Sequence, residues 1–286
     1  MYQSSELIIN EDGSVFHLHL KPGQIAGNII LVGDRARSAK VAAFFDSVDC
    51  DVQNREFHSI TGTYKGKRIS VISTGIGVGN IDIAINELDA LANIDFSTRE
   101  DFPVRKCLNM VRIGTSGGLQ PYTPEGTFVA SEYSFGFDGL PYFYNGNDSV
   151  RDKDAEEAFL QQCDYPANAA RPYCVHSDKS LLDRIAQGMV KGGTICAQGF
   201  YAPQGRQLRY GLSSPCLNEQ IRRFDYHGMR ICNMEMESAA LSALASIYGH
   251  KALTVCLIIA NRYGKSFIGD YNPLMEKLIR TVLDRI

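Results

Sequence analysis

The sequence predicts a single α/β domain, with helices on both faces of a central mixed, mostly parallel β-sheet in a three-layer α/β/α arrangement. Short apolar runs typical of buried strands alternate with amphipathic segments typical of helices. No linker, internal repeat or low-complexity stretch interrupts the 286 residues, a length within the range of one large α/β unit. We therefore expect one domain over residues 1–286, with 1–14 as an N-terminal extension and about 139–173 as a long excursion.

The predicted elements follow from these patterns in chain order. In the first half they are a strand at 29–32, a helix reaching 45, a hairpin of 63–64 and 68–73 with its turn around Gly66, an amphipathic helix through 83–91 and a strand at 108–113. In the second half they are a strand at 127–133, a helix at 181–190, a strand at 194–197, an Ala-rich helix at 239–248, a buried strand at 253–260 and a closing helix at 273–286.

Composition restricts the class of protein. Hydrophobic residues make up 44% of the chain, charged residues 21%, and the formal net charge is -3. This balance supports a sizeable core and gives no reason to expect a surface for nucleic acid or for an anionic membrane. No apolar run reaches transmembrane length, and the polar start of the chain is not a signal peptide.

The eight cysteines stand singly, with no C-x-x-C pair and no metal-ligand spacing. Several of them, such as Cys107, Cys196 and Cys256, fall in apolar, strand-like runs. We therefore expect reduced core thiols in a cytoplasmic protein, without disulfides and without a metal site.

Three glycine-rich strings follow predicted strands, at 33–37, 73–77 and 112–118. We expect turns there, at the carboxyl ends of strands, where open α/β sheets bind ligands. Each string alone is compatible with a tight turn beside a surface arginine, and none has the spacing of a P-loop or a dinucleotide fingerprint. Together, however, they supply close backbone approach and the donors Arg37, Arg112 and Thr115, which predict a site for one small oxyanion such as orthophosphate.

A second string, N-M-E-M-E-S at 233–238, runs directly into the Ala-rich helix. A carboxylate there can accept both hydrogens of a vicinal diol, and an adjacent methionine offers an apolar face to a sugar ring. The alternative is a helix start, where glutamate is favourable in any protein and methionine fills the core.

Taken together, these strings resemble the hexameric-type nucleoside phosphorylase family, and most closely its uridine phosphorylases. The matching strings occur in the same order over about residues 15–262 and include V-F-H-L at 15–18, Gly33-Asp34, R-I-G-T at 112–115 and the string at 233–238. F-Y-A-P-Q-G-R at 200–206 is similar to the segment that contacts the uracil edge in uridine phosphorylases. The resemblance implies reversible phosphorolysis of uridine to uracil and ribose 1-phosphate, with phosphate as co-substrate and no cofactor.

The resemblance also implies a role for each matching residue. Phosphate would be held by Gly33, Arg37, Arg112, Thr115 and, from a neighbouring subunit, Arg55. Ribose would be held by His17, Met236 and Glu237, and the base by Phe200, Gln204 and Arg206. Catalysis would depend on Arg112, Glu237 and Arg206. Because Phe16 and His17 would cross the subunit interface, the smallest active unit would be a homodimer, alone or within a hexamer of three dimers.

Three other functions stay open at this point: purine phosphorolysis, nucleoside hydrolysis and nucleoside binding without catalysis. Purine-specific relatives use an aspartate as general acid where this chain has Asn261, and an asparagine cannot protonate the purine N7. A nucleosidase uses water, which needs no cationic site, and a nucleoside-binding protein without catalysis needs no oxyanion site. The chain also departs from the family at Arg35, where proline is usual, and this change either loosens the first phosphate loop or adds a cation to it.

Overall fold

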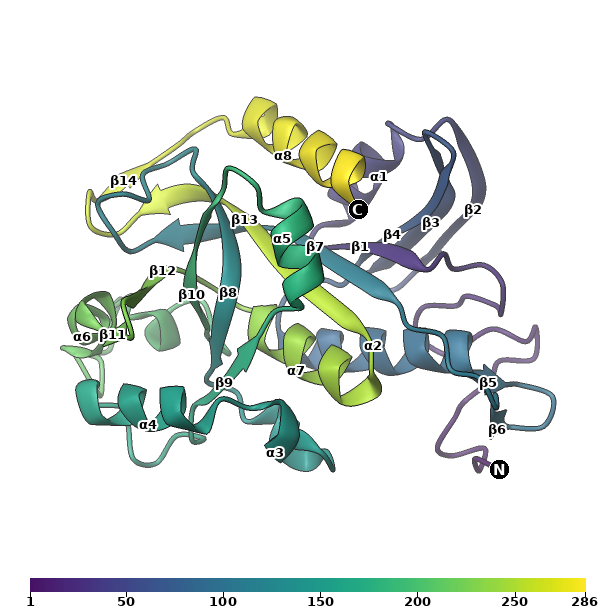
Figure 1. Cartoon of the computed structure of the whole chain (residues 1–286), viewed down its shortest axis with the longest axis horizontal. Coiled ribbons are helices and arrows are strands. Elements are labelled where there is room, and N and C mark those ends of the chain that lie inside the picture. Colours follow the sequence, from purple (N-terminus) through teal and green to yellow (C-terminus); the bar gives the residue numbers. More distant parts are fainter.

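A twelve-stranded mixed β-sheet runs through the molecule, and a separate two-stranded pair lies near the N-terminus (Figure 1). The computed structural model describes residues 1–286. The strands are β1 (Asn28–Val32), β2 (Ser47–Asn54), β3 (Phe57–Tyr64), β4 (Lys67–Ser73), β5 (Ile94–Asp95), β6 (Glu100–Asp101), β7 (Asn109–Gly118), β8 (Phe128–Gly136), β9 (Tyr173–His176), β10 (Val190–Cys196), β11 (Asp225–Tyr226), β12 (Met229–Glu235), β13 (Lys251–Asn261) and β14 (Ser266–Phe267).

Eight α-helices connect and cover these strands. They are α1 (Arg35–Ala42), α2 (Val78–Asn93), α3 (Asn147–Val150), α4 (Lys153–Gln162), α5 (Lys179–Ile185), α6 (Leu217–Arg223), α7 (Ser238–Tyr248) and α8 (Asn272–Arg285). Short 3-10 turns occur at Leu140–Phe143 and Ala202–Gln204. No helix is both long enough and apolar enough to cross a membrane.

The strand order is β11-β12-β10-β8-β13-β7-β1-β4-β3-β2. Strand β12 also pairs with β7, so that β7, β13, β8, β10 and β12 close into a barrel. Strand β1 is parallel to both β4 and β7, whereas β13 is parallel to β7 and antiparallel to β8. The prediction of one α/β fold with a mixed sheet is therefore confirmed, but the closed barrel was not predicted.

The barrel closes through residues that we expected to form a turn. The glycine-rich string at 114–118 continues β7, and its last two residues, Gly117 and Gly118, pair with Met234 and Asn233 of β12. A Cβ on Gly118 would lie 2.3 Å from the carbonyl oxygen of Thr123. Close approach of neighbouring backbone therefore requires glycine at position 118, and the prediction of a turn in this string was wrong.

Two apolar clusters pack on opposite faces of the sheet, because alternate residues of a strand point to opposite sides. In β1, Ile30 and Val32 belong to the cluster that includes buried residues of α1, α5 and α8. Ile29 and Leu31 belong to the cluster that includes buried residues of α2 and α7. Figure 1 accordingly shows α1 and α8 on one side of β1 and α2 and α7 on the other.

Some local predictions need correction. The helix expected at 181–190 ends at Ile185, and after Gly188, whose φ is +76°, the chain enters β10 at Val190. Strand β2 was not predicted, and the excursion contains a regular helix, α4, whose first turn is capped by the side chain of Asp152. All eight cysteines are free, but Cys107 is exposed rather than in the core.

Candidate active site

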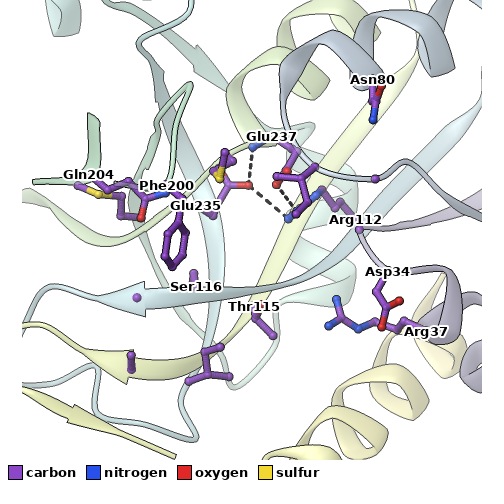
Figure 2. Close-up of a pocket in the computed structure, with 18 of the residues that line it drawn as sticks. Asp34, Arg37, Asn80, Arg112, Thr115, Ser116, Phe200, Gln204, Glu235 and Glu237 are labelled. Atoms are coloured by element: carbon purple, nitrogen blue, oxygen red, sulfur yellow. Dashed lines mark hydrogen bonds and ion pairs between the residues drawn. The ribbon is translucent and has the colours of Figure 1, made fainter. Parts of the chain in front are cut away.

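A cavity of about 1030 Å³ opens where the ends of β1, β4, β7 and β12 meet (Figure 2). Strands β1, β4 and β7 are parallel, so the segments at their carboxyl ends lie at the same edge of the sheet. Strand β12 runs antiparallel to β7 and reaches this edge by pairing with the last residues of β7. Nine of the predicted site residues line this cavity: Gly33, Arg37, Arg112, Thr115, Phe200, Gln204, Arg206, Met236 and Glu237.

The centre of the cavity is a buried ion pair between Arg112 and Glu237. Nη2 of Arg112 donates to Oε2 of Glu237, and Nη1 lies 3.3 Å from Oε2 of Glu235. Both partners of the central pair are almost completely buried. Burial lowers the pKa of Arg112, but the two carboxylates outweigh this effect, and its pKa is raised. The guanidinium is therefore firmly charged, and its charge is largely compensated by its own chain.

Glu235 and Glu237 have different structural roles. Glu235 ends β12 and accepts hydrogen bonds from the backbone N–H groups of Glu237 and Ser238, so it caps the start of α7. Glu237 points into the cavity, where its Oε1 accepts from the N–H of Gly77 at 2.7 Å. Burial raises the pKa of Glu237, Arg112 opposes that rise and Glu235 adds to it. Each oxygen of Glu237 keeps acceptor capacity, which hydroxyl groups of a sugar could use.

One end of the cavity is formed by the turn after β1, the start of α1 and part of β7. Gly33 follows β1, and a Cβ there would lie 3.3 Å from the carbonyl oxygen of Gly75, so glycine lets the two turns come together. Arg37, in the first turn of α1, lies on the same side of the cavity as Thr115 of β7 (Figure 2). Burial and the nearby charge of Arg112 lower the pKa of Arg37. Arg37 forms no salt bridge within the chain, so its charge remains available to a bound anion.

The opposite end of the cavity carries an aromatic ring and amide and guanidinium groups. Gln204 is buried, and its Oε1 accepts a hydrogen bond from Nη1 of Arg206 at 2.6 Å. The guanidinium of Arg206 lies 3.6 Å from the ring centroid of Phe200, which is half-exposed. Burial lowers the pKa of Arg206. These three side chains can together pack against a flat ring and hydrogen-bond to its polar edge.

Arg262 supports this end of the site and was not predicted. Its Nη1 donates to the backbone carbonyl of Gln204, which fixes the turn that carries that side chain. Burial, and then the charge of Arg206, lower the pKa of Arg262 to about 10. Arg262 directly follows β13, but no local pattern links it to residues 200–206.

Two predicted residues, His17 and Arg55, do not line the cavity. The backbone N–H of His17 donates to Glu87 at 2.9 Å, and its Nδ1 lies 2.7 Å from the same carboxylate. Arg55 lies in the turn between β2 and β3, with its guanidinium 5.3 Å from the ring centroid of Phe16. Phe16, His17 and Arg55 therefore gather at a second place on the chain, apart from the cavity.

Asn261 does not line the cavity either. Its Nδ2 donates to the carbonyl oxygens of Thr123 at 2.7 Å and Gln120 at 3.1 Å, and its Oδ1 accepts from the N–H of Gly264. An aspartate would lose both donated bonds, so the local structure also favours asparagine at position 261.

Several cavity residues were not predicted as site residues. They are Asp34, Arg35, Glu56, Gly75, Ile76, Asn80, Ser116, Gly117, Met234, Glu235, Ile259, Ala260 and Phe267. Most of them adjoin the glycine-rich and methionine-rich strings, so proximity in the sequence was a usable signal. Phe267 lies on β14, which reaches the cavity by pairing with the end of β13, and this pairing has no sequence signal. No group of three or more His, Cys, Asp or Glu side chains is arranged to hold a metal ion.

One cavity therefore combines an end with an arginine that has no salt-bridge partner, a central carboxylate, and an end with an aromatic ring and hydrogen-bonding side chains. Such an arrangement fits the transfer of a sugar between a planar leaving group and an oxyanion, because the sugar would lie over Glu237 between the two ends.

Known proteins share both the sequence and the fold. Residues 28–284 match the model of the phosphorylase superfamily. The chain is 31% identical over 275 residues to a uridine phosphorylase of Thermococcus kodakarensis, which covers 93% of this chain and 84% of that protein. It is 27% identical over 245 residues to a DeoD-type purine nucleoside phosphorylase of Listeria welshimeri, covering 85% of each.

A solved structure agrees with these matches. A Trypanosoma brucei nucleoside phosphorylase with uridine phosphorylase activity superposes with a TM-score of 0.89 at 26% identity, and the match covers 98% of both chains. The family match over most of the chain and the near-complete structural match lead to one conclusion: this chain belongs to the phosphorylase superfamily.

Proposed function

We propose that this chain is a uridine phosphorylase, a pentosyltransferase that converts uridine and phosphate into uracil and ribose 1-phosphate. The observation that carries the proposal is the placement of Gln204 at one end of the cavity and of Arg37 and Thr115 at the other, with Glu237 between them. Arg206 lines the same cavity and hydrogen-bonds to Gln204. The similarity to uridine phosphorylases of Thermococcus kodakarensis and Trypanosoma brucei supports it.

In the proposed reaction, phosphate binds against Gly33, Arg37 and Thr115 and attacks C1′ of the ribose. Glu237 accepts hydrogen bonds from the ribose hydroxyls while Met236 contacts the sugar ring. Arg112 lies between phosphate and Glu237, so it can stabilise the attacking anion and hold the carboxylate in position. Positioning of this kind matters because the transition state is a loose, oxocarbenium-like sugar between two partners.

The base leaves as an anion whose charge spreads onto the carbonyl oxygens of uracil. Arg206 supplies a charged donor fork to that edge, and Gln204 offers one acceptor and two donors for the base amide and carbonyl groups. Phe200 packs on the ring. Nη1 of Arg206 donates to Oε1 of Gln204, so the two side chains hold each other in position beside the base.

We further propose that residues 1–286 act as one domain on a layered α/β/α core, with 1–14 as an extension and 139–173 as an excursion. Its site would be completed by His17 and Arg55 of a partner subunit, in a homodimer or a hexamer of three dimers. The enzyme would be cytoplasmic and need no cofactor beyond its co-substrate, phosphate.

A purine nucleoside phosphorylase is the second candidate, because a DeoD-type relative is 27% identical. The observation against it is Asn261, whose polar atoms are engaged by backbone groups and which cannot act as a general acid. A nucleosidase is disfavoured by Arg37 and Arg112, since an attacking water needs no cations.

The deciding experiment measures base release from uridine, thymidine and inosine, each with and without phosphate. We expect rapid release of uracil only with phosphate and slow release of hypoxanthine. Uracil release without phosphate would establish a nucleosidase, and inosine cleaved as fast as uridine would refute the argument from Asn261. Replacing Gln204 and Arg206 with alanine should abolish uridine cleavage while phosphate still protects the protein against thermal unfolding.

A further inference from the structure

The charges of the cavity leave its anion end short of cations. Arg112 faces two carboxylates, Glu235 and Glu237, within its own chain. A guanidinium compensated in this way attracts a dianion less than a free one does. On the phosphate side Arg37 is a cation without a carboxylate partner, and phosphate at neutral pH carries more than one negative charge. A second uncompensated cation from the same chain near Arg37 would therefore strengthen phosphate binding, beside the Arg55 that a partner subunit would supply.

Arg35 meets this requirement. It lines the same cavity as Arg37, two residues earlier at the start of α1. Its only side-chain hydrogen bond goes from Nη2 to Oε1 of Gln53, at 2.5 Å, and it forms no salt bridge. A guanidinium has five N–H donors, so most of those of Arg35 remain available to an anion.

The hydrogen bond that holds Arg35 in place does not neutralise its charge. Gln53 lies in β2, next to Asn54 and two residues before Arg55. An amide oxygen can orient a guanidinium without neutralising it, whereas a carboxylate at the same place would form an ion pair. The last residues of β2 therefore position Arg35 at this chain's cavity, immediately before the turn that carries Arg55.

We propose that Arg35 is an additional phosphate-binding residue and that Gln53 is the positioning residue that holds it at the cavity. The proposal rests on the proposed function, because the anion is the co-substrate phosphate. The same contact would bind the phosphate group of the product, ribose 1-phosphate.

The test compares steady-state kinetics of the full-length wild type with those of Arg35→Ala and Arg35→Lys. Losing one charge-assisted contact should raise the KM for phosphate about tenfold, with kcat and the KM for uridine changed by less than about twofold. Arg35→Lys should restore part of the loss. An unchanged KM for phosphate in Arg35→Ala would overturn the proposal. The control is Lys40→Ala, which removes the same charge from the same helix but from a residue that donates to Asn272.

Gln53 is tested by a double-mutant cycle. Gln53→Leu removes the amide that holds Arg35 without adding a charge, and it should raise the KM for phosphate in the wild-type background. In the Arg35→Ala background the same change should have no further effect. An equal effect in both backgrounds would show that Gln53 acts on its own and would refute its positioning role.

A second readout separates this proposal from the proposed function. Thermal unfolding is followed with increasing inorganic phosphate and no nucleoside, because a ligand that binds the folded state raises the midpoint. Arg35→Ala should need about tenfold more phosphate than the wild type for the same rise. If the wild type fails to cleave uridine but shows this difference, the activity is wrong and the anion site stands. If it cleaves uridine and the two titrations coincide, the anion site is wrong.

Discussion

At the scale of the residue, the central feature of the site is the buried carboxylate of Glu237, paired with the buried guanidinium of Arg112 in the middle of the cavity. Breaking such a pair leaves an unpaired charge away from water, which is costly. Glu237 accepts from both Arg112 and the N–H of Gly77, so groups of its own chain set its orientation. Sites of this kind trade stability for function, because the fold must keep a charge where burial disfavours it.

The raised pKa of Glu237 predicts how stability depends on pH. A carboxyl whose pKa is raised by folding stabilises the fold below its unfolded pKa, about 4.3, and this contribution is lost as pH rises through the folded pKa. Glu237→Gln should therefore gain stability relative to the wild type as pH rises from about 4 to 7, while uridine cleavage is lost. Thermal unfolding across this range measures the difference, and a difference that stays flat or falls contradicts the prediction.

A side chain at position 114 should impair catalysis by displacing Arg112. A Cβ at this position would lie 2.3 Å from Nη1 of Arg112 and 3.0 Å from Sγ of Cys256. Because Glu237 holds the guanidinium, Gly114→Ala should force it away from its position and lower kcat/KM about a hundredfold, as for loss of one transition-state donor. Gly27→Ala is the matched control, since its Cβ would meet nothing within 4 Å. Equal kinetics for the two variants would refute the argument.

At the scale of the element, local patterns identified the segments that bear the site. The methionine and glutamate string leads into α7, as predicted, because the start of a helix leaves a local signature. That the same string also ends a strand, β12, was not predicted. The string at 112–118 was misread as a turn because glycines that permit close strand pairing look the same as glycines that form a turn. Which strands pair is decided by residues far apart in sequence, and the pairing of β7 with β12 has no local signal.

The excursion of residues 139–173 contains its own buried ion pair. Nε and Nη2 of Arg151 donate to both oxygens of Glu156, at 2.8 and 2.5 Å. Glu156 also accepts from the N–H of Cys174 in β9, and Arg151 lies over the ring of Tyr142. One ion pair therefore joins α4, the 3-10 turn and the sheet.

Arg151→Ala should therefore lower the free energy of unfolding by about 3–5 kcal/mol, because it leaves Glu156 buried without its partner. The matched control is Arg171→Ala, which breaks the exposed pair with Glu157 and should cost about 0–1 kcal/mol. Denaturant unfolding measures both variants. Neither should change the KM for uridine or phosphate, and a similar cost for the two would show that the excursion is not held by this pair.

At the scale of the whole molecule, the site is built by a closed sheet, but part of the predicted site lies elsewhere. Strands β1, β4, β7 and β12 bring the cavity residues together within one chain. Phe16, His17 and Arg55 form a separate group, in which Arg55 packs over Phe16 and His17 contacts Glu87. The sequence indicated these residues only through the family resemblance, because nothing local to them requires convergence with the other site residues.

The last prediction concerns this second group and the assembly that would use it. If each site takes His17 and Arg55 from its neighbour, a two-fold interface presents the same patch of both chains and completes two equivalent sites. His17→Ala/Arg55→Ala chains and Glu237→Ala chains should each be inactive alone. After mixing under conditions that allow subunit exchange, activity should return, because some mixed dimers contain one site with all of its residues. Exchange is verified by mass measurement of differently labelled chains. Proven exchange without activity, or a fully active wild-type monomer, would exclude a shared site and would place the function of His17 and Arg55 within the single chain.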